Sequence, residues 1–111
     1  MAVRPVVLGA LIALLLGPSQ ATAQRTTSDA LIACERYAAV DFKRRNPAFR
    51  RFVIDRSGVT VDRFADKVGS QFVSAIYHGR AFYDAGTGPK VVRFLCLYAM
   101  GRGPLFVYAL D

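Results

Sequence analysis

Hydrophobic and polar positions follow two different periods along this chain of 111 residues. In the first pattern, apolar side chains recur every three to four positions, at Leu31, Cys34, Ala38 and Phe42. This spacing places them on one face of a helix. Thr27 or Ser28 can cap the start of that helix, and Pro47 disfavours helical backbone just before it. The pattern therefore predicts an amphipathic helix over Ser28–Arg45.

After Pro47 the period changes to two, which is typical of strands. Five segments rich in Val, Ile, Phe and Tyr show it: Phe49–Asp55, Val59–Phe64, Phe72–Tyr83, Lys90–Ala99 and Leu105–Leu110. Short connections such as Arg56-Ser57-Gly58 and Ala65–Gln71 favour hairpins. The predicted fold is α+β, with one N-terminal helix packed on a curved antiparallel sheet of four or five strands.

The first 23 residues have the pattern of a cleavable export signal. Arg4 precedes an apolar run over residues 6–16, and Ala21-Thr22-Ala23 supplies the small residues of a cleavage site. We therefore expect a mature chain of residues 24–111, folded as one small domain. Its expected location is the periplasm or the extracellular space, with no transmembrane anchor after processing.

Two alternatives concern the same N-terminal region. A permanent anchor is disfavoured because the apolar run is shorter than the about 20 residues of a bilayer span. A lipoprotein would be cut and acylated after a tetrapeptide such as Leu31-Ile32-Ala33-Cys34. A polar stretch separates that tetrapeptide from the apolar run, and lipidation would leave Cys96 without a partner.

Cys34 and Cys96 are the two cysteines of the chain. In an exported protein they most simply form a disulfide, since a redox motif places its cysteines two residues apart and a zinc site needs four ligands. The disulfide would join the helix to the fourth strand. It would also turn the face of that strand that carries Val92, Phe94, Cys96 and Tyr98 toward the helix.

The opposite face of the fourth strand carries Val91, Arg93, Leu95 and Leu97. Together with Leu105 or Phe106 from the fifth strand, these side chains make a face less polar than one that meets water usually is. Three explanations stay open: a binding partner, a homodimer formed through the sheet face, or a strongly curled sheet.

The chain is basic, with 15 Lys and Arg against 8 Asp and Glu and a formal net charge of +7. Six candidate anion-binding residues cluster after the helix: Lys43, Arg44, Arg45, Arg50, Arg51 and Arg56. Arginine matches phosphate and carboxylate groups, so an anionic envelope component is a candidate partner. The alternative is that cations at a helix C-terminus favour the helix dipole and keep the protein in solution. Export would remove the protein from nucleic acid, which we do not expect as a partner.

A second candidate surface is the hairpin Tyr77–Gly88, where Tyr77, His78, Arg80 and Asp84 could contact another exported protein. His78 is the only histidine, and no spacing selects a nucleophile or carboxylate to work with it. We therefore expect neither enzymatic activity, nor a cofactor, nor a metal site.

A helix with one cysteine, followed by strands and a late Phe94-Leu95-Cys96, resembles small exported bacterial domains of unknown function. The likeness covers most of Ser28–Leu110 in outline and implies an α+β fold and a periplasmic location. A second likeness is to periplasmic lysozyme inhibitors, which are also small, disulfide-bonded and β-rich. Their usual architecture is an all-β barrel without an opening helix, and their inhibitory loops have no match in this chain.

Overall fold

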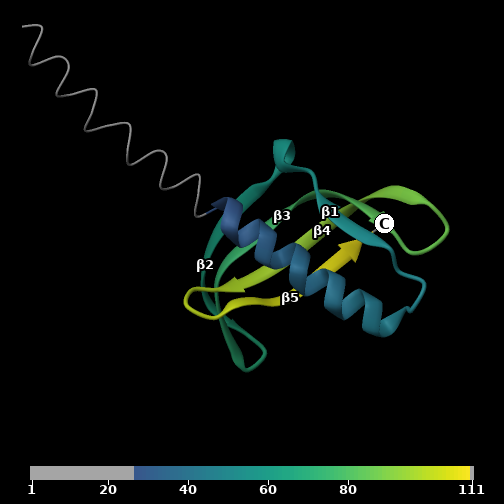
Figure 1. The fold of residues 1–111 in the computed structure, drawn as a ribbon. Coiled ribbons are helices and arrows are strands. Elements are labelled where there is room, and N and C mark those ends of the chain that lie inside the picture. Colours follow the sequence, from purple (N-terminus) through teal and green to yellow (C-terminus); the bar gives the residue numbers. More distant parts are fainter. Residues whose placement is uncertain (1–26, 111) are drawn as a thin grey trace, which may run out of the picture.

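The computed structural model describes residues 27–110, so the predicted export signal lies outside the described residues. In the described part, a helix over residues 27–45 precedes five strands and one turn of 3-10 helix. The elements are β1 (Arg51–Ile54), η1 (Arg56–Gly58), β2 (Thr60–Val68), β3 (Gln71–Asp84), β4 (Pro89–Ala99) and β5 (Gly103–Leu110). Figure 1 shows the helix lying across the sheet, which confirms the predicted α+β fold.

All strand pairs are antiparallel, and β3 is the centre of the sheet. β4 pairs with one edge of β3 and β5 pairs with β4. The predicted hairpin between the first two strands is wrong, because β1 and β2 both pair with the other edge of β3. Asp55 accepts hydrogen bonds from the backbone nitrogen and hydroxyl of Ser57, so the chain makes a local turn and continues along the same neighbour.

The second strand is longer than its alternation predicts. Its pairing with β3 shifts register between Arg63 and Asp66, which interrupts the period-two pattern, and then continues to Val68. The predicted connection Ala65–Gln71 therefore shrinks to the two turn residues at 69 and 70. Gly69 has φ of +65° at the first turn position, which fits a type II′ hairpin.

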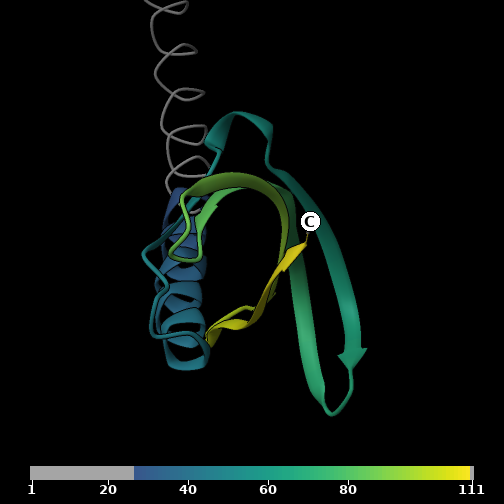
Figure 2. The ribbon, with the colours of Figure 1, turned by 90° about the vertical axis from the view of Figure 1, so that its right-hand side faces the viewer.

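The sheet is strongly curled, and the helix lies on its concave side (Figure 2). The far ends of β2 and β3 project beyond the helix, and most side chains of β2 are accordingly exposed. We call the side of the sheet that faces the helix the inner face, and the opposite side the outer face. Curling was one of the three explanations for a weakly polar outer face, and the structure shows it.

The inner face is closed by a disulfide and an aromatic cluster. Cys34 of the helix is bonded to Cys96 of β4, and both residues are fully buried. The predicted helix face is buried as well, and Phe42 packs edge-on against three other rings. Those rings belong to Phe49, Phe52 and Tyr83. The inward orientation expected for Val92, Phe94 and Cys96 is therefore confirmed.

Candidate functional site

The basic cluster at the end of the helix is largely neutralised by partners within the protein. Arg44 Nη2 donates a hydrogen bond to Asp41 Oδ1 at 2.6 Å, and Arg45 Nη2 lies 3.1 Å from Asp41 Oδ2 as an ion pair. Asp41 is buried, whereas both arginines remain exposed. Lys43 Nζ donates to the carbonyl oxygen of Pro47 at 2.8 Å. The contacts of these three cations therefore stabilise the C-terminal end of the helix.

Arg56 is the fourth paired member of the cluster, and its partner is Glu35 of the helix. The two guanidinium nitrogens lie 2.8 and 3.1 Å from the two carboxylate oxygens. Glu35 Oε2 also accepts a hydrogen bond from the backbone nitrogen of Ile54 at 2.8 Å. The pair thus ties the middle of the helix to the end of β1.

Arg50 and Arg51 differ from the other four. Both are exposed, and within residues 27–110 neither guanidinium makes a hydrogen bond or an ion pair. The backbone nitrogen of Arg50 donates to the carbonyl oxygen of Asp84, so the position of this segment is fixed while its charges stay in water. Of the six predicted anion-binding residues, these two have charges that are not engaged by the protein.

The predicted interaction hairpin is divided between the two faces of the sheet. Tyr77 points to the inner face, 7% exposed, with its ring against Tyr98 at 5.6 Å between centroids. Burial raises the pKa of Tyr77. Asp84 is also 7% exposed, and its Oδ1 accepts hydrogen bonds from the backbone nitrogens of Gly86 and Gly88 at the turn. Both side chains are occupied within the fold.

The turn after β3 is also held against the segment that follows the helix. Asn46 Nδ2 donates to the carbonyl oxygen of Ala85 at 3.0 Å. Gly86 has φ of +113°, and a Cβ atom there would lie 2.8 Å from the carbonyl oxygen of Ala48. A residue with a side chain could not occupy this position without displacing backbone, so the tip of the hairpin is a packed element of the fold.

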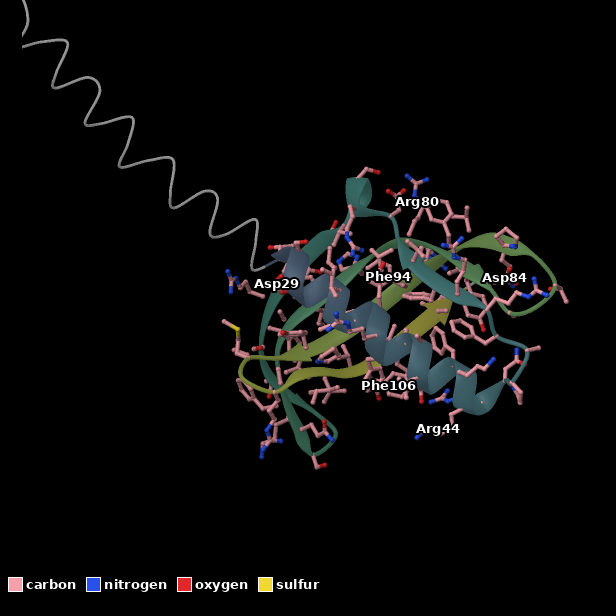
Figure 3. The ribbon with its side chains drawn as sticks, viewed as in Figure 1. Asp29, Arg44, Arg80, Asp84, Phe94 and Phe106 are labelled. Atoms are coloured by element: carbon pink, nitrogen blue, oxygen red, sulfur yellow. A yellow bond between two sulfur atoms is a disulfide. The ribbon has the colours of Figure 1, made fainter. Side chains whose placement is uncertain are left out.

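His78 and Arg80 lie on the outer face, together with residues from three other strands. Arg80 is directly opposite Arg93 of β4, and His78 is directly opposite Leu95. His78 Nε2 lies 2.7 Å from Asp62 Oδ2 of β2, and both side chains are partly exposed. Figure 3 shows Arg80 near η1, whose first residue is Arg56 of the basic cluster, and Arg44 of the same cluster at the opposite side of the molecule.

These residues line an open groove of about 520 Å³ on the outer face. The lining includes both arginines, the His78–Asp62 pair and the apolar side chains of Ile76, Leu95 and Leu110. The volume falls within the range of roughly 300–1,000 Å³ that is typical of small-molecule sites. The arginines of β3 and β4 supply the positive charges that could orient a ligand near the apolar wall.

The two arginines of the groove have no acidic partner within ion-pair distance in the described part of the chain. Asp55 is close enough for Arg80 to act on it electrostatically. Hydrogen bonds from Ser57 lower the pKa of Asp55, and the charge of Arg80 adds to that effect. Like charges directly opposite each other across a strand pair are destabilising. An anion placed between Arg80 and Arg93 would relieve this repulsion and accept hydrogen bonds from both.

The groove brings together two arginines, an imidazole–carboxylate pair and apolar side chains. Asp62 is the hydrogen-bond partner of His78, and in residues 27–110 no hydroxyl or thiol group is hydrogen-bonded to that imidazole. The same residues contain no group of three or more His, Cys, Asp or Glu side chains placed to hold a metal ion. The expectations of no enzyme and no metal remain predictions.

Sequence reasoning did not select two charged members of this groove, Arg93 and Asp62. The alternation along β4 places Arg93 on the same face as Leu95, which identifies its side of the sheet but not its neighbour. Its position opposite Arg80 depends on the register of β3 with β4. The contact of Asp62 with His78 depends on β2 pairing with β3 rather than with β1.

Comparison with protein-family models, with curated proteins and with solved structures finds no match to this chain. The assignment of function therefore depends on the groove and the charges described above. In residues 27–110 no helix has both the length and the hydrophobicity needed to cross a bilayer.

Proposed function

We propose that this chain is an exported, non-enzymatic binding domain whose ligand carries negative charge and binds at the outer face of the sheet. The observation that carries the proposal is the pair Arg80 and Arg93, directly opposite each other and without an acidic partner within ion-pair distance in the described residues. Like charges directly opposite each other across a strand pair cost stability, and an anion bound between them would offset that cost.

Export is supported by two features. A disulfide joins Cys34 and Cys96, and disulfides persist mainly in oxidising compartments outside the cytosol. The apolar run and small-residue site in residues 1–23 have the pattern of a cleavable signal. We propose the periplasm or the extracellular space as the location.

Association with an anionic envelope surface is a second candidate function, carried by the free charges of Arg50 and Arg51. Without Arg4 of the signal the formal net charge falls from +7 to +6, which still adds a long-range attraction to such a surface. A protein-interaction or inhibitor module is the alternative. Of its four predicted contact residues, Tyr77 and Asp84 are buried, so His78 and Arg80 are the two that a partner could contact.

The proposal is tested by titrating the purified protein with acetate and with inorganic phosphate while amide NMR shifts are recorded. We expect saturable shifts at Arg80, Arg93 and Leu95 that weaken as the salt concentration rises. The double variant Arg80→Gln/Arg93→Gln should lose them. A control with the same loss of charge, Arg36→Gln/Arg102→Gln, should retain them.

Three results separate the candidates. Absence of saturable shifts with either anion would contradict an anion site at the outer face. Shifts confined to Arg50 and Arg51, together with salt-sensitive binding to vesicles of anionic lipid, would favour the envelope-surface candidate. A protein complex captured from the envelope that survives high salt and is lost in the arginine double variant would favour the interaction module.

A further inference from the structure

The outer face continues from the arginine pair as an apolar strip. Its members are Ile76, Leu95, Leu97, Tyr108 and Leu110, and at its border the guanidinium carbon of Arg45 lies 5.6 Å from the ring centroid of Phe106. The strand register shows that they are neighbours: Leu97 is opposite both Ile76 and Phe106, and Leu95 is opposite Tyr108. Leu110 is directly opposite Arg93, so the strip begins beside the charged end of the groove.

A second hollow, of about 220 Å³, follows the groove along the strip. Leu97 and Tyr108 are among the side chains that line it, and Leu97 is two residues beyond Leu95 of the groove. From Arg93 to Leu97 the strand advances roughly 13 Å at the usual rise per residue. The arginine pair therefore has apolar side chains on both sides along the strands: Phe82 and Val91 on one side, and the strip with Leu95 and Leu97, hollowed in two places, on the other.

We infer that the outer face binds a single-chain anionic amphiphile, such as a fatty carboxylate or a monoalkyl phosphate. Its head group lies between Arg80 and Arg93, where guanidinium groups match carboxylate or phosphate oxygens. Its alkyl chain lies along Leu95, Ile76 and Leu97, which removes apolar surface of both molecules from water. This inference rests on the proposed anion site and adds the apolar half of the ligand.

Charge and shape favour this occupant over a second copy of the chain or a bilayer. A second copy whose two-fold axis passed through the arginine pair would bring two further arginines toward Arg80 and Arg93, which would add like-charge repulsion. A bilayer surface is broad, whereas the strip is bordered on the β2 side by the polar pair Asp62 and His78. A single alkyl chain with an anionic head group matches both the arginine pair and the hollowed apolar side chains beside it.

The test uses three probes with the purified protein at concentrations below micelle formation. Decanoate has head and chain, acetate has the head alone, and decyl glucoside has the chain with an uncharged head. Isothermal titration calorimetry should give decanoate an affinity at least about tenfold above either other probe, since burial of each methylene group contributes favourably. Decanoate should also shift the amide signals of Leu95 and Leu97.

Two sets of variants divide the site into its halves. Arg80→Gln/Arg93→Gln should weaken decanoate at least about tenfold, whereas Arg36→Gln/Arg102→Gln should change it less than about twofold. Leu95→Ser/Leu97→Ser should reduce decanoate affinity toward that of acetate and leave the acetate shifts at Arg80 and Arg93 unchanged. The acetate shifts also report whether these variants are folded.

Each opposing result has a distinct meaning. If acetate binds at the arginine pair and decanoate binds no tighter, the amphiphile inference fails while the anion site stands. If neither acetate, phosphate nor decanoate binds, the proposed function fails as well. Binding to anionic vesicles without binding of monomeric decanoate would overturn the inference in favour of a membrane surface, and a concentration-dependent dimer that excludes decanoate would overturn it in favour of a second copy.

Discussion

The two faces of the sheet have similar alternation in sequence but different surroundings in the fold. The inner face is covered by the helix, crossed by the Cys34–Cys96 disulfide and filled by an aromatic cluster around Phe42. The outer face has comparable apolar content, yet Phe82 and Val91 are 45% and 59% exposed. Apolar composition alone therefore does not make a core. A strand face becomes core only where another element covers it.

The arginines show the same contrast. Arg56 meets the carboxylate of Glu35 and thereby joins the helix to β1. Arg80 and Arg93 are at directly opposite positions on neighbouring strands of the outer face. The first arrangement stabilises the fold, and the second is expected to cost stability until an anion binds. The difference indicates which charges serve the structure and which are available to a ligand.

The largest contrast between the faces is expected from two matched phenylalanine substitutions. Phe94→Ala removes a ring that is 2% exposed on the inner face, and we expect a loss of about 3–5 kcal/mol in the free energy of unfolding. Phe82→Ala on the outer face should cost less than about 1 kcal/mol. Urea denaturation measures both. Equal losses would show that the outer face is covered in solution.

Removal of the disulfide should have the next largest effect. The bond closes a separation of 62 residues, for which loop-closure entropy amounts to roughly 4 kcal/mol, within a range of about 2–5 for native disulfides. We expect the variant Cys34→Ala/Cys96→Ala to unfold at a correspondingly lower urea concentration. A loss below about 1 kcal/mol would mean that the helix is held on the inner face by packing alone.

Loss of the Glu35 carboxylate should have an intermediate effect. Glu35→Ala leaves the backbone nitrogen of Ile54 without its acceptor and Arg56 without its partner, which should cost about 1–3 kcal/mol. Glu35→Gln retains an oxygen acceptor for Ile54 and should cost less. The two variants are compared by thermal unfolding, and an equal loss in both would assign the effect to the charge of Glu35 rather than to the backbone contact.

The smallest effect should have the opposite sign. Arg80→Gln or Arg93→Gln removes one member of the like-charged outer pair and should stabilise the ligand-free protein by about 0.2–1 kcal/mol. The gain should shrink as salt is added. Arg36→Gln, on the exposed side of the helix, is the control and should change little. A destabilised Arg80→Gln variant would indicate that Asp55 is a structural partner of that arginine.

The elements of the fold were largely predictable, and their partners were not. The apolar spacing through Leu31, Cys34 and Phe42 identified the helix, and alternation identified five strands. The pairing of β1 and β2 with the same edge of β3 was missed, because a three-residue connection permits either a hairpin or a continued strand. In this fold the hydrogen bonds between Asp55 and Ser57 stabilise a local turn, after which the chain continues along the same edge of β3.

The candidate site was predicted in part. His78 and Arg80 were selected from a glycine-containing segment, and the structure places both in the outer groove. Tyr77 and Asp84 were selected with them, but their side chains are buried in the core and the turn. Tyr77 is adjacent to His78 and therefore points to the opposite face, whereas Asp84 has the same parity as Arg80 and is buried at the turn, where it accepts hydrogen bonds from Gly86 and Gly88.

By itself, the sequence determined the helix, the alternating strands, the two faces of β4 and the pair of cysteines available to join them. These are local properties, because periodicity and residue type act over a few neighbouring positions. Only the tertiary structure decided that Arg80 lies opposite Arg93, that Asp62 meets His78 and that Glu35 neutralises Arg56. Those contacts depend on strand register and on the curl of the sheet, which bring together residues that no short-range pattern connects.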